Sequence, residues 1–266
     1  MRTPRPVGIV VPVAEEFAAY PELLGGMRRL ERCGPWEIHE GTAGNRRVVV
    51  VISDCGPANA GAATERVIAQ FDPVVVLHGG SAGAHDLGLL PGDVVIGSQV
   101  CILAGSAEQT SRRERGLHPK RLRFRRDGVR VHLDRGRSDP ELVELAARNA
   151  REVVVAVGPW AGPGWPPGTP RREGQVVVGL IGSADTWTVE ADDIRALREA
   201  CRTDCEDMES AFVAQVCAMH GLPFLVVRAI SNNEIVCPLA PGEVAQAVTD
   251  AGARAARVLA RVAADL

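Results

Sequence analysis

The sequence predicts an α/β fold in which three layers are built around a central mixed sheet. The first observation behind this prediction is a series of short, strongly apolar runs with the length of buried strands. The second is that these runs alternate with helical patterns and often end in small or polar residues, as in α/β domains. The expected strands lie near residues 7–11, 47–52, 74–78, 94–97, 176–181 and 223–230.

The segments between these strands carry helix and hairpin patterns. Residues 14–17 follow the first strand, and we expect them to open a helix that reaches about Leu30. Residues 36–52 alternate between polar and apolar side chains around a turn at 43–45, which predicts a β-hairpin. A loop of small residues at 53–63 leads into a helix with one apolar face. Further helices are expected at about 140–151, 192–200 and from Glu243 onward.

Composition excludes several classes of protein. The chain of 266 residues has 46% hydrophobic residues and a net charge of −3, so its overall charge does not suit a nucleic-acid or membrane binder. No apolar run approaches the ~20 residues that span a bilayer, and the N-terminus lacks the apolar stretch of a signal peptide. The seven Cys form no CxxC pair, which is typical of reduced thiols and a cytoplasmic location.

The middle of the chain, at about residues 104–175, differs from the rest. Residues 112–137 contain ten Arg and one Lys against three acidic residues, and residues 158–174 are rich in Trp, Pro and Gly. Basic side chains could hold a phosphate or a nucleic acid, but no aromatic ladder accompanies them. We therefore expect a solvated hairpin or a subunit-contact arm, inserted into a single domain that spans residues 1–266.

Two polar clusters flank one helix and one strand near the C-terminus. Asp207, Met208 and Glu209 are expected to open a helix that closes at Gly221, with Glu206 just before them. The apolar strand that follows ends in the polar run 231–234. Side chains at the carboxyl ends of such strands usually line the crevice of an α/β fold. A structural interpretation is also open, in which Asp207 only caps the helix and the two Asn only make a turn.

Three further strand ends are candidate site positions. Residues 78–83 form a loop with free N–H groups and one hydroxyl that could cradle an anion, although it matches neither a Walker loop nor a dinucleotide fingerprint. Trp187, after the strand at 176–181, is either a stacking surface for a planar ligand or a core edge. Glu15 and Glu16, after the first strand, are either site carboxylates or charges in the first turn of a helix.

Four pieces of the sequence together resemble the nucleoside phosphorylase/nucleosidase superfamily. They are residues 54–60, 80–83 with 91–95, 183–187, and 207–211 with 227–231. The likeness covers about residues 7–103 and 176–262, and it is greatest to 5′-methylthioadenosine/S-adenosylhomocysteine nucleosidases, with futalosine hydrolases next. It implies a partly barrel-like sheet, no cofactor, and a homo-oligomer (dimer, trimer or hexamer) with active sites near a subunit interface.

The resemblance also implies roles for individual residues. Glu16 matches the carboxylate that orients the attacking water, and Met208 with Glu209 matches the ribose contacts. Trp187 falls where an aromatic ring stacks on the base. Asn232 falls where the nucleosidases have an Asp that donates a proton to the purine, which is a departure from the family pattern. The remaining substrate-binding candidates are Ser81, Ala82, Gly83, Asp207 and Ser231.

These residue types suit the hydrolysis of the N-glycosidic bond of a purine nucleoside, with release of the free base. Such cleavage passes through an oxocarbenium-like sugar, so a carboxylate must polarise the nucleophile while other groups stabilise the departing base. Related phosphorylases carry Arg where this chain has His78, and the acidic loop at Glu15 and Glu16 would repel phosphate, so we expect water as the nucleophile. No metal is expected, since His78, His85 and His220 show no ligand spacing.

Several alternatives stay open. One is a 6-oxopurine nucleosidase resembling futalosine hydrolase, which the amide of Asn232 favours because it offers donors as well as an acceptor. AMP nucleosidase and purine nucleoside phosphorylase activities are others. A nucleoside-binding regulatory protein would keep the fold without the chemistry, and a protein that works through its basic middle segment would contact nucleic acid or nucleotide phosphate.

Overall fold

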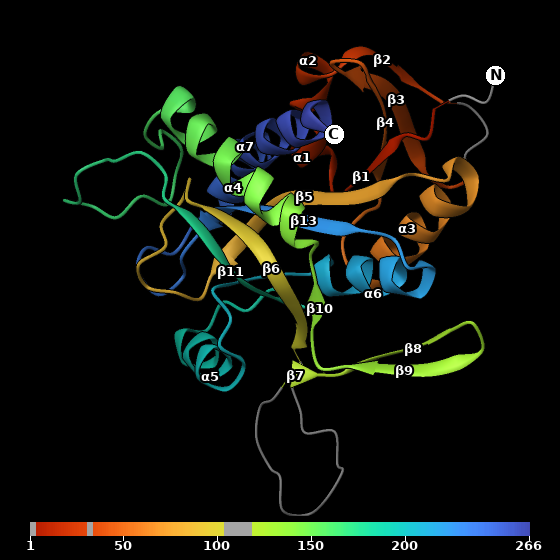
Figure 1. Cartoon of the computed structure of the whole chain (residues 1–266). Helices are drawn as coiled ribbons and strands as arrows, with labels where there is room; N and C mark the ends of the chain where they lie inside the picture. The colour runs from red at the N-terminus through yellow and green to blue at the C-terminus, as the bar shows by residue number, and fades with distance from the viewer. Residues whose placement is uncertain (1–3, 31–33, 104–118) are drawn as a thin grey trace, which may run out of the picture.

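The computed structural model describes residues 4–30, 34–103 and 119–266, and it has an α/β architecture around one large mixed sheet (Figure 1). The part of the basic segment before residue 119 lies outside these ranges. The strands run as follows: β1 Val7–Val11, β2 Gly25–Arg29, β3 Glu37–Ala43, β4 Arg46–Ile52, β5 Val75–Ala84, β6 Val94–Leu103, β7 Pro119–Lys120, β8 Leu122–Arg126, β9 Val129–Leu133, β10 Gly136–Arg137, β11 Val176–Ser183, β12 Cys205–Asp207 and β13 Phe224–Asn232.

The helices connect these strands. They are α1 Ala14–Phe17, α2 Tyr20–Leu23, α3 Pro57–Phe71, α4 Pro140–Val157, α5 Ala191–Cys201, α6 Ser210–His220, the 3-10 turn η1 Pro241–Glu243, and α7 Val244–Asp265. Within the described ranges, no helix is long and apolar enough to cross a bilayer.

The centre of the sheet closes on itself as a partial barrel. β5, β12, β11 and β6 are neighbours in that order, and β13 joins the two ends because it pairs in parallel with β5 and antiparallel with β6. β1, β4, β3 and β2 extend the sheet beyond β5. The expected α/β class with a mixed, partly barrel-like sheet is therefore confirmed.

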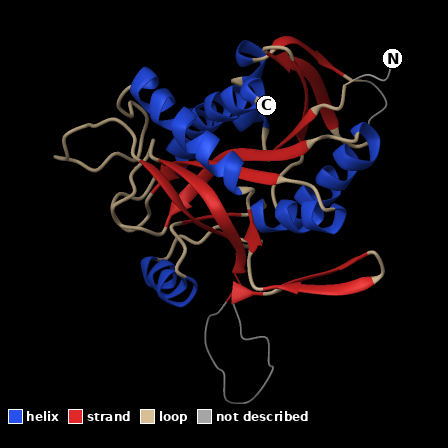
Figure 2. Ribbon diagram, in the orientation of Figure 1, coloured by secondary structure: helices blue, strands red, loops and turns tan. Residues whose placement is uncertain are grey.

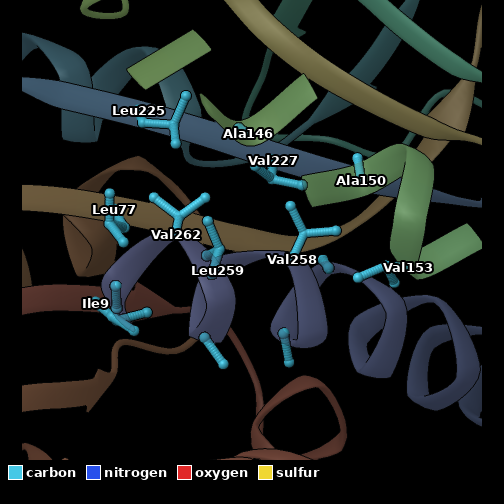
Figure 3. Close-up of a cluster of buried hydrophobic side chains, with 14 of the residues drawn as sticks. Ile9, Leu77, Ala146, Ala150, Val153, Leu225, Val227, Val258, Leu259 and Val262 are labelled. Carbon is cyan, nitrogen blue, oxygen red and sulfur yellow. The ribbon is translucent and has the colours of Figure 1, made fainter. Parts of the chain in front are cut away.

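Helices cover both faces of the sheet (Figures 1 and 2). On one face α7 and α4 pack their apolar side chains against β1, β5 and β13, and Figure 3 shows Leu259 and Val262 of α7 near Leu77 of β5 and Val258 near Val227 of β13. On the other face α3 and α6 bury a second cluster against the same strands. This three-layer packing holds the carboxyl ends of β1, β5 and β13 together.

The expected strands are all present, and so is the hairpin, formed by β3 and β4. The expected helix from residue 14 to Leu30 is wrong, because the chain makes only α1 and α2 before it pairs β2 with β3. A Pro at the start of α2 and the Gly25–Gly26 pair, with φ +61° at Gly26, end the helical conformation early.

Three other expected boundaries are also corrected. Residues 78–83 are not a loop but the second half of β5, since β13 and β12 pair with this stretch. Asp207 belongs to β12, and α6 begins only at Ser210 with Glu209 as its N-cap. The middle segment contains α4, which is longer than expected and buries Ala146, Ala150 and Val153 in the core beside α7.

Candidate active site

A cavity of about 470 Å³ opens at the carboxyl ends of β1, β5 and β13. The ten residues that the sequence analysis proposed as catalytic or substrate-binding all lie in its wall, although the strands that carry them are far apart along the chain. These candidates are Glu16, Ser81, Ala82, Gly83, Trp187, Asp207, Met208, Glu209, Ser231 and Asn232. The first turns of α7 close one side with apolar side chains.

Glu16 is the carboxylate that follows β1, and only 4% of it is exposed. Its Oε1 atom accepts hydrogen bonds from the Ser81 N–H (2.6 Å) and the Ser81 hydroxyl (2.7 Å). Burial raises the pKa of Glu16, while Arg228 and the hydrogen bonds from Ser81 oppose that rise. A carboxylate with a raised pKa that is held at a fixed position suits a general base.

Arg228 is a central member of the site that the sequence did not single out, because it lies inside the apolar run of β13. It is 1% exposed, and its Nε atom lies 2.7 Å from Asp207 Oδ2 while its Nη2 atom donates to Glu209 Oε2 (3.2 Å). Its Nη1 atom donates to the Ser81 carbonyl (3.2 Å). The guanidinium thus ties together groups from β5, β12, β13 and the start of α6.

His78, on β5, is a neutral side chain that binds Arg228. Its Nδ1 atom lies 2.8 Å from the Val10 carbonyl, which can only accept, so Nδ1 carries the proton. The Nε2 lone pair then accepts from Arg228 Nη2. Burial, together with the charge of Arg228, lowers the pKa of His78 to about 3.

His78, Asp207 and Glu209 bring possible metal-ligand atoms within 4.8 Å of one another, a cluster that the sequence spacing of the histidines did not reveal. The guanidinium of Arg228 contacts all three side chains. A metal ion at this point would have to displace a buried cation from two carboxylates. The three side chains are therefore better explained as the groups that bind the guanidinium of Arg228.

The two carboxylates beside Arg228 have different environments. Asp207 Oδ1 accepts from the N–H groups of Glu209 and Ser210 (both 3.1 Å), so Asp207 does satisfy the start of α6, as the structural interpretation expected. Burial opposes ionisation of Asp207, but Arg228 and hydrogen-bonded hydroxyls lower its pKa. Glu209 accepts from the Gly56 N–H (2.9 Å), from Arg228 Nη2 (3.2 Å) and from the Met208 N–H (3.3 Å), and burial raises its pKa to about 7.

Trp187 and Asn232 also line the cavity. Trp187 is 43% exposed, which argues against the core-edge interpretation and leaves its ring available for stacking. The amide of Asn232 is oriented by two hydrogen bonds: the Ser231 hydroxyl donates to its Oδ1 (2.6 Å), and its Nδ2 donates to Glu234 Oε1 (2.8 Å). Such an amide still has one N–H and one lone pair for a ligand.

Comparison with known proteins agrees with this fold. A family model described as the phosphorylase superfamily matches residues 6–265. The chain belongs to the phosphorylase superfamily. The matched range includes the middle segment, which the sequence motifs did not reach.

Within this superfamily the chain is similar to several bacterial nucleosidases, including the following two. The 5′-methylthioadenosine/S-adenosylhomocysteine nucleosidase of Lysinibacillus sphaericus is 28% identical over 85% of each chain. The enzyme of the same name from Chromohalobacter salexigens is 27% identical over 86% of this chain and 84% of its own.

Solved structures of superfamily members share the fold. The Neisseria meningitidis 5′-methylthioadenosine/S-adenosylhomocysteine nucleosidase in complex with methylthio-immucillin-A has a TM-score of 0.75 at 24% identity, over 99% of this chain and all of the other. The futalosine hydrolase of Helicobacter pylori has a TM-score of 0.77 at 21% identity, over 98% of each chain.

Proposed function

We propose that this protein hydrolyses the N-glycosidic bond of a purine nucleoside and releases the free base. The observation that carries the proposal is the pair of buried carboxylates, Glu16 and Glu209, which line one cavity. Ser81 donates a hydrogen bond to Glu16, and Arg228 forms an ion pair with Glu209. Glycosidic cleavage needs a base for the nucleophile and negative charge near the cationic sugar, and these groups can supply both. The names of the similar nucleosidases support the same reaction.

In the proposed reaction Glu16 is the general base. A water molecule between Glu16 and the sugar would give a proton to the carboxylate as its oxygen bonds to C1′. The electron pair of the broken C1′–N bond would leave with the purine. Glu209 would accept hydrogen bonds from the ribose hydroxyls beside Met208, and Trp187 would stack on the base.

The charges of the cavity favour water over phosphate. Among the described residues that line it, Arg228 is the only cation, and its donors already serve Asp207, Glu209 and His78. The acidic members of the wall are Glu15, Glu16, Glu206, Asp207 and Glu209. A phosphate dianion, or a 5′-phosphate on the substrate, would be repelled there. This argues against phosphorolysis and against AMP as the substrate.

An uncharged 5′ substituent fits the remaining wall. The side chains nearest the start of α7 are apolar: Leu239, Pro241, Val244, Ala245 and Val248. Similar nucleosidases are named for 5′-methylthioadenosine, whose 5′ group is an uncharged thioether, as well as for S-adenosylhomocysteine. We further propose a cytoplasmic homo-oligomer with one such site per subunit, in a single domain, without cofactor, metal or nucleic-acid partner.

A panel of nucleosides assayed for released base, with and without phosphate, tests this proposal. We expect base release that needs no phosphate, with free ribose rather than ribose 1-phosphate as the second product. Ribose 1-phosphate as the main product in phosphate buffer would overturn the hydrolase assignment. Tight binding of nucleosides without any turnover would instead support a regulatory binding protein.

A further inference from the structure

Glu206 is a buried carboxylate in the cavity wall that the proposed hydrolysis does not use. It lies on β12, is 4% exposed, and faces the segment that carries Trp187. Its Oε1 atom accepts from the Thr188 N–H (2.7 Å), and its Oε2 atom accepts from the Thr188 hydroxyl (3.0 Å). Thr188 directly follows Trp187, so Glu206 lies at the end of the cavity where a stacked base would be.

The charge of Glu206 is poorly compensated. Asp207 and Glu209 form ion pairs with Arg228, whereas no Arg or Lys in the described ranges forms an ion pair with Glu206. Its nearest basic atom is His85 Nε2, at 3.2 Å, and that buried atom has no hydrogen-bond partner among the described residues. A carboxylate has about four acceptor positions, and Thr188 takes two of them. Glu206 therefore retains acceptor capacity for a donor from a ligand.

The edge of the base decides which purine supplies that donor. A 6-oxopurine such as hypoxanthine or guanine carries a hydrogen on N1, which a carboxylate can accept. Adenine has a lone pair on N1, which repels a carboxylate that faces it. Leaving a buried polar group without a partner is a strong source of discrimination between similar ligands.

Asn232 also lines the cavity, and its amide is compatible with a 6-oxopurine base. Its amide keeps one N–H and one lone pair after its bonds to Ser231 and Glu234, so it can meet the O6 and N7 edge of the same base. An amide has no proton to give up, which suits a base that leaves more readily as an anion. The 6-oxopurines are more acidic than adenine and meet that condition.

We propose that Glu206 accepts a hydrogen bond from N1–H of a 6-oxopurine, so that the enzyme prefers hypoxanthine- or guanine-type nucleosides to adenine-type ones. This inference rests on the proposed nucleosidase function and specifies its substrate class. Glu206 is then a specificity residue, and Thr188 is a positioning residue that orients its carboxylate.

The test compares 5′-methylthioinosine with 5′-methylthioadenosine, which share one 5′ group, in the wild type and in Glu206→Gln. We expect the wild type to favour the inosine-type substrate in kcat/KM. In Glu206→Gln the ratio of kcat/KM for the inosine-type substrate to kcat/KM for the adenosine-type substrate should fall about 10- to 100-fold, which is the effect of one charge-assisted hydrogen bond. The Gln amide loses the bond from N1–H and can instead donate to N1 of adenine. General damage to the site would lower both rates and leave the ratio unchanged, which would overturn the proposal.

Glu190→Gln is the matched control, since it makes the same exchange at an exposed residue before α5 that does not line the cavity. Its substrate ratio should stay within about threefold of the wild type, compared with the 10- to 100-fold expected for the loss of a charge-assisted hydrogen bond. A wild-type preference for adenine would also overturn the proposal.

Calorimetric binding of free hypoxanthine, 1-methylhypoxanthine and adenine to the wild type gives a readout without turnover. Hypoxanthine should bind at least about tenfold more tightly than the other two, as the loss of one charge-assisted bond implies. Equal binding of the three bases would refute the role of Glu206. If no nucleoside is cleaved but this order of binding holds, the hydrolase proposal fails while the specificity role stands.

Discussion

Replacing Glu16 by Gln separates catalysis from stability in this protein. The Gln side chain has nearly the same shape, and its oxygen can still accept from the N–H and hydroxyl of Ser81, which lie 2.6 and 2.7 Å from Glu16 Oε1. Among the hydrogen bonds of Glu16 in the described chain, the one at risk is the long bond from the Val13 N–H (3.4 Å). What the variant loses is the ability to take a proton from water.

The expected loss of rate is that of general-base catalysis. Such a group contributes about 10²- to 10⁴-fold, which corresponds to about 2.7–5.4 kcal/mol in the activation free energy. In the wild type, kcat/KM should rise with pH as the carboxylates ionise, and Glu209, with a pKa of about 7, should make activity fall below neutral pH. The variant should be slow at every pH.

The stability of Glu16→Gln should not fall above neutral pH. The folded-state pKa of Glu16 lies above its ordinary value of 4.5, so the folded protein holds this proton more tightly than the unfolded chain. That contribution is fully present below pH 4.5 and is lost as pH rises through the raised pKa. Gln has no proton to lose, so its free energy of unfolding at pH 8 should equal or exceed that of the wild type.

The assay pairs base release with thermal unfolding at pH 8, with Glu22→Gln on the exposed surface of α2 as the control. Turnover within tenfold of the wild type would refute the general-base role of Glu16. A marked drop in Tm with a matching loss of rate would show that Glu16 acts through stability instead.

Three further predictions test other parts of the site. Glu209→Gln should weaken the binding of ribosides by about 1.5–3 kcal/mol and leave 2′,3′-dideoxy analogues little changed, so equal losses on both would contradict a ribose role. Gly252→Ala should lower both Tm and turnover, because the added Cβ would lie 2.6 Å from Glu16 Cα, an overpacking cost of about 1–3 kcal/mol; Gly242→Ala, which meets open space, should do neither. Serine in place of three arginines of the β8–β9 hairpin should leave turnover of an unphosphorylated nucleoside within several-fold, an order-of-magnitude expectation for peripheral side chains that a larger loss would disprove. Those arginines are Arg123, Arg125 and Arg126.

Local patterns in the sequence were sufficient to place most of the elements. Apolar runs mark strands such as β1 and β13 because every residue of these strands is buried, on both faces of the sheet. Gly221 marks the end of α6 because its φ of +65° suits a residue without a side chain. The polar residues just past the strand ends indicated a common site because such ends meet at one edge of a sheet.

The sequence by itself therefore determined the fold class and the candidate residues of the cavity, but the tertiary structure alone decided how their charges are arranged. Arg228 stands in an apolar run and becomes the centre of the site only because β13 pairs with β5 in a register that sets it opposite Gly80, beside Ser81. The tertiary structure also decides the environment of Glu206, a buried carboxylate that has no Lys or Arg partner in the described chain and lies against Thr188 and His85. Burial, pairing and pKa depend on distances across the fold, which a local pattern does not contain.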